Sequence, residues 1–448
     1  MPPLKMDVLE EHFAEAAFLW SQWERALQSP AYDVLETAAL EERLLAHLDG
    51  LVLGGEVVAG ELLLPALEAD DAGKISAAAF ALLSGNGKRE LEETLAVFDG
   101  GDALQQNSVG RALGLSEREG LEAALRKRLK ADDVALRVAA FQVLSFRGAI
   151  SAEFRGEWLY RDDAGQVIAA LQDANPLSQD IVQSLLPRLL VDPRPGVREA
   201  AIMAGLVSGA SPAWKACRQV AKEGGEGRRQ CLVTLALGRD EKDAEWLASL
   251  VNNEEQRADV LWALGFSGQT VAAEACLQVM HDERVANLAG EAFSAITGLK
   301  LEGKYQLPPP EEEESLVPLD DEDLDKDLVP GPEASLPLPA ADAVEGWWKQ
   351  ARKSFERGTR YLRGQKADEV ELLDALRSEP MRRRPVHALD LSIRSRGAQN
   401  LQPQAFTLRQ LAEWEKARAG STRVSKHPFA KIFLGWGKAV TSRRKRLV

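Results

Sequence analysis

A pattern that recurs about every 30 residues constrains the fold of this 448-residue chain more than any other feature. In the stretch VDPRPGVREAAIMAGLVSG, an aspartate-containing turn precedes a Val-Arg pair, several small residues and a closing glycine. A weaker copy of the pattern occupies residues 70–85. The other copies align, in steps of 29 to 31 residues, on Arg137, Ile168, Arg198, Arg229, Ala258 and Asn287.

A period of this length is typical of helical-hairpin repeats, in which each hairpin has an apolar face that only the next hairpin can cover. The small residues after each turn allow neighbouring helices to approach closely, and the turn aspartate is placed to cap the following helix. Leucine and alanine dominate the apolar residues, and runs that alternate in the manner of strands are almost absent. We therefore predict an all-α fold, a HEAT-like solenoid of about seven helix pairs with helical caps at both ends.

Composition divides the chain into four predicted segments. Residues 1–60 are expected to form an N-terminal helical cap, and residues 61–301 the HEAT-like repeats. Residues 302–341 are rich in proline and acidic residues, which disfavour a packed core, so we expect a linker there. Residues 342–448 are expected to form a basic C-terminal helical domain.

The net charge of −14 is unevenly distributed. Residues 341–448 hold 24 basic and 11 acidic residues, whereas residues 1–304 hold 30 basic and 47 acidic residues. The favoured interpretation of the basic end, including the tail SRRKRLV, is a solvated basic face that could dock on the acidic remainder of its own chain; the alternatives are an acidic protein partner and phosphate binding. Because the acidic repeats would repel a nucleic-acid duplex, nucleic acid is the least favoured of these partners.

Five residues are candidates for binding a partner: Trp347, Trp348, Arg382, Arg383 and Arg384. Adjacent residues on a helix point about 100° apart, so one tryptophan can be buried while the other faces a partner. The alternative is that both rings pack between helices. The three arginines are the densest cationic run ahead of the tail.

The sequence contains no recognisable catalytic or cofactor-binding pattern. It has no GxSxG, no glycine-rich loop ending in GK[ST] and no CxxC. Cys217, Cys231 and Cys276 stand far apart within the repeats, and we expect them to be small buried residues. We therefore predict a protein that is not an enzyme and needs no cofactor.

One arrangement of metal-binding residue types remains as an alternative. His12 and Glu15 would share a face of the first helix and meet His47 and Asp49 at the end of the second. We favour a structural interpretation, in which His47 interacts with the C-terminal end of that helix and Asp49 with Gly50 forms the turn that ends it. On this interpretation there is no metal site.

No segment of the sequence predicts membrane insertion. The N-terminus lacks the basic-then-apolar layout of a signal peptide. The most apolar window, residues 51–67, contains Glu56 and Glu61 and is too short to cross a bilayer. The three isolated cysteines fit a reducing compartment, so we expect the protein to be cytoplasmic.

Four stretches together resemble a family of uncharacterised proteobacterial HEAT-like repeat proteins associated with type VI secretion gene clusters: EAAFLW, SPAYDVLETAALEERLLAHLDGL, EAFSAITGLKLEG and RRRPVHALDLSIRSRG. The resemblance implies a bacterial accessory protein and supplies no catalytic residues. We therefore expect a non-enzymatic protein-binding scaffold, an adaptor or chaperone for a type VI secretion effector or spike component. The alternative is a nucleic-acid-binding or base-excising helical-repeat protein.

Overall fold

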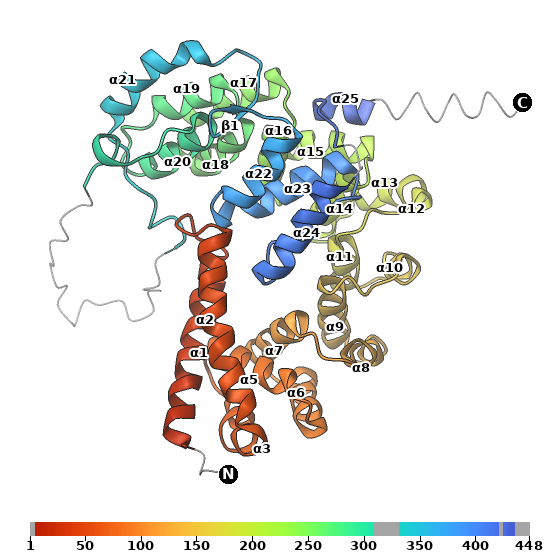
Figure 1. The fold of residues 1–448 in the computed structure, drawn as a ribbon. Coiled ribbons are helices and arrows are strands. Elements are labelled where there is room, and N and C mark those ends of the chain that lie inside the picture. The colour runs from red at the N-terminus through yellow and green to blue at the C-terminus, as the bar shows by residue number, and fades with distance from the viewer. Residues whose placement is uncertain (1–4, 309–330, 421–423, 435–448) are drawn as a thin grey trace, which may run out of the picture. The chain divides into compact units, whose positions relative to one another are not determined.

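The computed structural model describes residues 5–308, 331–420 and 424–434. Figure 1 shows that the regular secondary structure of these residues is helical, and a two-stranded hairpin is the one sheet among them. The prediction of an all-α fold is therefore confirmed. The chain divides into two compact units, each built from segments that are distant in sequence.

Unit 1 combines residues 1–28, 32–216 and 391–423. A π-helical turn, Ala59–Leu63, lies between its third and fourth helices. Its helices are α1 (Met6–Ala26), α2 (Val34–Leu53), α3 (Gly55–Val58), α4 (Leu64–Ala66), α5 (Ala72–Ser84), α6 (Lys88–Gly100), α7 (Ala103–Leu115), α8 (Leu121–Arg128), α9 (Val134–Phe146), α10 (Ala152–Trp158), α11 (Ala164–Gln172), α12 (Gln179–Ser184), α13 (Leu186–Leu189), α14 (Val197–Val207) and α24 (Thr407–Ala419).

Unit 2 combines residues 29–31, 217–390 and 424–448. The boundaries between the units fall inside α15 (Ser211–Glu223) and α23 (Arg384–Ser395). The other elements of unit 2 are α16 (Arg228–Leu237), α17 (Glu241–Ser249), α18 (Arg257–Ser267), α19 (Thr270–Gln278), α20 (Ala286–Thr297), α21 (Ala341–Ala351), β1 (Tyr361–Leu362), β2 (Gln365–Lys366), α22 (Glu369–Ser378) and α25 (Phe429–Leu434).

The repeat in the sequence marks equivalent helices in the structure. Each of the six aligned positions falls within the first five residues of a helix, namely α9, α11, α14, α16, α18 and α20. The predicted capping is present at Asp133, which accepts from the Ala135 backbone N–H at 3.0 Å, and at Asp163, which accepts from that of Gln166 at 2.8 Å. It is wrong for α14, α16, α18 and α20, whose first residues are not capped by a side chain. In unit 1, α5, α7, α9, α11 and α14 pack one against the next. In unit 2, α16, α18 and α20 do the same.

Small residues set the distance between some of these helices, as the sequence predicted. Gly205 on α14 is the clearest case, because a Cβ atom there would lie 2.5 Å from the Ala213 Cβ and 3.1 Å from a Leu186 methyl group. Any larger residue would push the α14 helix away from its neighbours, which would open a gap in a closely packed core.

The C-terminal segment 391–423 is an integral part of unit 1. The Phe406 ring lies among three aromatic rings of the N-terminal helices, with centroid distances of 6.4 Å to Trp20, 4.9 Å to Trp23 and 5.5 Å to Phe80. The predicted C-terminal domain 342–448 is therefore divided between the two units. Local composition could not indicate this, because the partners of Phe406 lie more than 300 residues earlier in the chain.

The end of the second helix and the predicted linker are the two remaining features that the sequence analysis addressed. The prediction that Asp49 and Gly50 end the second helix is wrong, because α2 continues to Leu53 and the chain turns only at Gly55, whose φ is +64°. Of the predicted linker, residues 309–330 lie outside the described residues. Its two flanks are joined, because the Leu307 backbone N–H donates to the Leu338 carbonyl at 2.8 Å.

Candidate functional site

The structure places the two predicted tryptophans on α21, against α20. The Phe293 ring meets both of them nearly edge-on, with centroid distances of 6.1 Å to Trp347 and 5.5 Å to Trp348. Trp348 is 6% exposed and belongs to the core, whereas Trp347 is half-buried. The structure thus agrees with the interpretation in which both rings pack, and only Trp347 keeps an exposed edge.

The predicted arginine run lies in the interior of unit 2. Arg383 is 2% exposed and Arg384 is 1% exposed, and the Arg382 side chain is 7% exposed. The guanidinium group of Arg382 lies 4.5 Å from the Trp262 ring and 3.1 Å from the Glu333 carboxylate. These arginines therefore do not form an exposed cationic patch that a partner could contact. The tail SRRKRLV lies outside the described residues.

Glu379 is the carboxylate around which this buried cluster is organised. Its Oε2 atom accepts from the Arg383 Nε at 2.7 Å and lies 2.8 Å from the His387 Nε2, and His387 is completely buried. Since the carboxylate can only accept, His387 donates from Nε2. A guanidinium group remains buried only where charged partners offset its lost hydration, and Glu379 supplies that partner for Arg383.

The sequence reasoning missed this cluster, although a local signal was present. Glu379, Arg383 and His387 are spaced four residues apart, a spacing that brings side chains together on a helical turn. A second, largely buried carboxylate, Glu291, comes from α20 and forms an ion pair with Arg382 at 3.5 Å. No local pattern connects Glu291 with residues that lie about 90 positions later.

The two carboxyl groups have pKa values shifted in opposite directions. Burial would raise the pKa of Glu379, but the charges and hydrogen bonds of His387 and Arg383 outweigh burial and hold this pKa well below its usual range. At Glu291, burial is the dominant effect, and it raises the pKa despite the nearby Arg383 and Arg382. Glu379 is therefore ionised at neutral pH, while Glu291 binds a proton more readily than a free glutamate.

A cavity of about 320 Å³ adjoins this cluster within unit 2. Glu291 and Ser294 of α20 line one part of it, and Glu379 and Arg383 line another. Leucines and prolines make up much of the remaining wall, and the exposed residues at its rim include Lys300 and Arg363. A concave, partly apolar space with a few charged groups at one end is the usual form of a small-ligand site.

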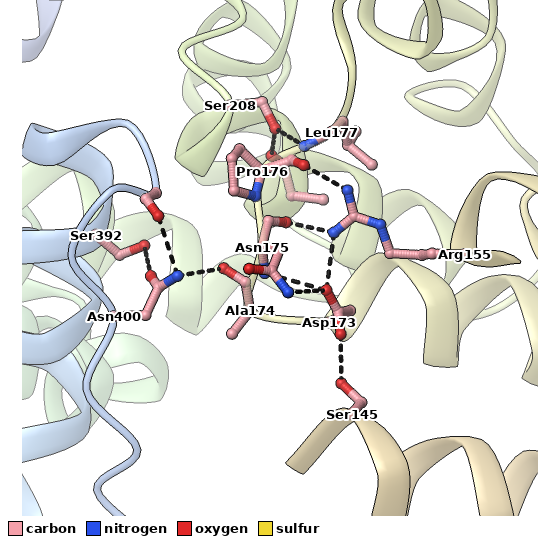
Figure 2. Close-up of polar contacts among 12 residues, drawn as sticks. Ser145, Arg155, Asp173, Ala174, Asn175, Pro176, Leu177, Ser208, Ser392 and Asn400 are labelled. Atoms are coloured by element: carbon pink, nitrogen blue, oxygen red, sulfur yellow. Dashed lines mark hydrogen bonds and ion pairs between the residues drawn. The ribbon is translucent and has the colours of Figure 1, made fainter. Parts of the chain in front are cut away.

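A second polar cluster, in unit 1, holds the loop between α11 and α12. Figure 2 shows Asp173 between Arg155, whose Nη1 atom donates to it at 2.9 Å, and Ser145, whose hydroxyl donates at 2.8 Å. The Asn400 side chain of the C-terminal segment donates to the Ala174 carbonyl at 2.9 Å. Arg155 and Asp173 are almost fully buried. We interpret this cluster as structural, because its members bind one another and the backbone of the loop.

The two histidines of the alternative metal arrangement meet, and the favoured prediction that His47 interacts with the C-terminal end of its own helix is wrong. The Nδ1 atoms of His12 and His47 lie 2.9 Å apart, so His47 contacts the first helix and not the C-terminal end of its own. The pKa of His47 is lowered, first by burial and then by the charge of His12. Among the described residues, no three His, Cys, Asp or Glu side chains are grouped so that they could hold a metal ion. The three cysteines are buried, as expected.

Unit 1 also contains an open cavity of about 610 Å³ between two successive repeat turns. Tyr160 and Val191 line it and are 61% and 75% exposed. They are 31 residues apart, which is the spacing of the repeat, and so occupy matching places in neighbouring repeats. Arg194 joins the two turns, because it pairs with Asp192 at 2.7 Å and donates to the Asp162 carbonyl at 2.8 Å.

No family model and no curated protein matches the chain. Among solved structures, the Escherichia coli protein YibA is 14% identical, with a TM-score of 0.38, over 56% of this chain and 96% of YibA. Human deoxyhypusine hydroxylase in complex with glycerol is 18% identical, with a TM-score of 0.26, over 63% and 96%. An engineered protein is 16% identical, with a TM-score of 0.26, over 63% and 89%. At these values, none of the three assigns the chain to a family or an activity.

Proposed function

We propose that this chain is a non-enzymatic scaffold that binds another protein through the repeat turns of unit 1. The observation that carries the proposal is the cavity of about 610 Å³, which is lined by the solvent-exposed side chains of Tyr160 and Val191. A tyrosine beside a concave surface is typical of the residues that dominate the affinity of protein interfaces. Exposed apolar side chains on two successive repeats would present two anchor points to one partner segment.

The surface around this cavity is held in place before any partner arrives. The pairing of Arg194 with Asp192 fixes one turn, and its bond to the Asp162 carbonyl fixes that turn to the preceding one. A pre-formed surface loses less conformational entropy on binding than a mobile loop does, so a modest number of contacts suffices for a useful affinity. With Arg161 and Arg188 also lining the cavity, we expect the partner to offer an apolar side chain flanked by acidic residues.

The biological setting rests on the sequence resemblance alone. On that basis the proposed partner is a type VI secretion effector or spike component, and the chain is its cytoplasmic adaptor or chaperone. One finding is compatible with this setting: throughout residues 5–308, 331–420 and 424–434, every helix is too short or too polar to span a lipid bilayer.

Co-purification from the native host, followed by mass spectrometry, tests the proposal. The test variant combines Tyr160→Ala with Val191→Asp, both at exposed positions, and the matched control is Val370→Asp, at a residue of unit 2 that is 60% exposed. We expect a protein that co-purifies with the wild type and the control but not with the test variant. Identical protein sets from all three would refute the proposed surface, and a set without any secretion component would refute the proposed setting.

A further inference from the structure

The 320 Å³ cavity of unit 2 carries a second inference, which does not depend on the proposed function. Four of its lining residues each have a buried polar atom that makes no hydrogen bond: Ser294 Oγ, Glu379 Oε1, Arg383 Nη1 and Glu291 Oε1, the last of which lies 3.5 Å from Arg382 Nε in an ion pair. The Glu379 and Arg383 side chains are 2% exposed, and that of Glu291 is 10% exposed. Buried polar groups normally make hydrogen bonds, so four such atoms on residues that line one cavity point to a polar occupant.

The four atoms without hydrogen bonds define which donors and acceptors the occupant must have. Two of them are carboxyl oxygens, and the Glu379 carboxylate is held ionised by its cationic neighbours, so it requires an N–H or O–H donor. Arg383 Nη1 can only donate and requires an acceptor. The Ser294 hydroxyl can do either. An occupant with a cationic group alone would leave Arg383 Nη1 without an acceptor, and one with an anionic group alone would leave both carboxyl oxygens without a hydrogen-bond donor.

The remaining lining residues match the same kind of ligand. Three acidic and three basic residues line the cavity: Glu291, Glu302, Glu379, Lys300, Arg363 and Arg383. This balance favours a ligand without net charge. Much of the rest of the wall is apolar, including Leu299, Leu301 and Leu336. These leucine side chains would pack against an apolar part of the ligand, and they offer no hydrogen bond to a charged group.

We propose that this cavity binds a small zwitterion with an apolar body, of which an apolar α-amino acid is the simplest example. Its ammonium group donates to the oxygens of Glu291 and Glu379, and its carboxylate accepts from Arg383 Nη1. Its side chain lies against the leucines of the wall. Ordered water is the competing occupant, because water can also donate and accept at each of these atoms.

Calorimetric titration of the full chain with matched small molecules separates these possibilities. The probes are valine, leucine, methionine and phenylalanine, together with two analogues of leucine that each lack one charge, isoamylamine and 4-methylpentanoate. We expect at least one of the amino acids to bind saturably, with an affinity at least about tenfold higher than that of its single-charge analogue. Leucinamide, which keeps the ammonium group and loses the carboxylate, should bind as weakly as isoamylamine.

Two variants localise the binding. Glu291→Gln keeps the shape of the cavity and removes one carboxylate, so the affinity should fall about tenfold, and Ser294→Leu should abolish binding by filling the space. The matched control is Glu345→Gln, at a glutamate on α21 that does not line the cavity. Circular dichroism checks that each variant is folded, and Glu291→Gln alone suffices if Ser294→Leu does not fold. Three results would overturn the proposal: no saturable binding of any amino acid up to about 10 mM, equal binding of a single-charge analogue, or unchanged binding to Glu291→Gln.

Discussion

Replacement of Glu41 by alanine tests whether the C-terminal segment is built into unit 1. Glu41 on α2 is 4% exposed and accepts three hydrogen bonds. The Trp23 indole donates at 2.7 Å, the Thr407 backbone N–H at 2.7 Å and the Thr407 hydroxyl at 2.6 Å. Because Thr407 is the first residue of α24, this carboxylate holds the start of that helix against the N-terminal helices.

The expected cost follows from what Glu41→Ala leaves behind. The Trp23 indole N–H and the Thr407 backbone N–H both lose their buried acceptor, and each such loss costs about 1–3 kcal/mol. Burial raises the pKa of Glu41 more than its hydrogen bonds lower it. Burial of the ionised carboxylate therefore already lowers the stability of the wild type. The two losses together would cost about 2–6 kcal/mol, and we therefore expect a total near the lower end of that range, about 3 kcal/mol.

Hydrogen–deuterium exchange read by mass spectrometry measures this loss locally. A decrease of about 3 kcal/mol in the free energy of opening corresponds to exchange that is roughly 150-fold faster in peptides from α24, Thr407–Ala419. Thr407→Val, which removes only the hydroxyl donor, should accelerate the same amides by about fivefold. Peptides from α19 in unit 2 should be unchanged in both variants. Unchanged exchange in α24 of Glu41→Ala would refute the assignment of this segment to unit 1.

The raised pKa of Glu41 also predicts a pH dependence. A carboxyl group with a raised pKa binds its proton more tightly in the folded protein than in the unfolded chain, whose value is 4.5. Its contribution to stability is therefore complete below pH 4.5 and is lost as the pH rises through the folded-state value. In urea denaturation, the stability difference between wild type and Glu41→Ala should narrow from acidic to neutral pH. A difference that widens over this range would contradict the reasoning.

Three further predictions concern individual contacts. Arg155→Met leaves the Asp173 carboxylate buried without its charge partner, so urea denaturation should show unit 1 less stable by about 3–5 kcal/mol, and equal stability would refute the structural role in Figure 2. Burial raises the pKa of Cys276 to about 12, so this thiol should react with a thiol reagent only on unfolding, and labelling of the native chain would contradict its position. Hydrogen bonds from Arg284 lower the pKa of Asp282 to about 2. In Arg284→Ala, the pKa of Asp282 measured by NMR titration should rise towards 3.8, and an unchanged titration midpoint would exclude Arg284 as the cause.

Much of the fold could be predicted from the sequence because it depends on local, repeated features. The alignment on Arg137 and its equivalents located the starts of six helices. The aspartates before two of them, Asp133 and Asp163, cap those helices through bonds that span two or three residues. Such signals are contained in a window shorter than one repeat. The pairing of residues 391–423 with the N-terminal helices is set by aromatic and hydrogen-bonded contacts over the whole chain, which no local window contains.

The candidate sites were harder to predict for the same reason. A run of three arginines has the composition of an exposed basic patch, and only the position of Glu291 and Glu379 shows why it is buried. The exposure of Tyr160 and Val191 depends on where successive repeat turns lie, which the repeat period alone does not give. In both cases the sequence supplied the residues, and the stacking of helices decided whether they face solvent.

The most direct test of the account is the affinity of the purified chain for the protein that co-purifies with it. Titrations should compare the wild type, the Tyr160→Ala variant and the Val370→Asp control. Truncation of a central interface tyrosine typically costs more than about 1 kcal/mol, so we expect the dissociation constant to rise by about fivefold or more for Tyr160→Ala and to stay unchanged for Val370→Asp. Equal dissociation constants for the wild type and Tyr160→Ala would contradict the claim that the repeat turns of unit 1 bind the partner.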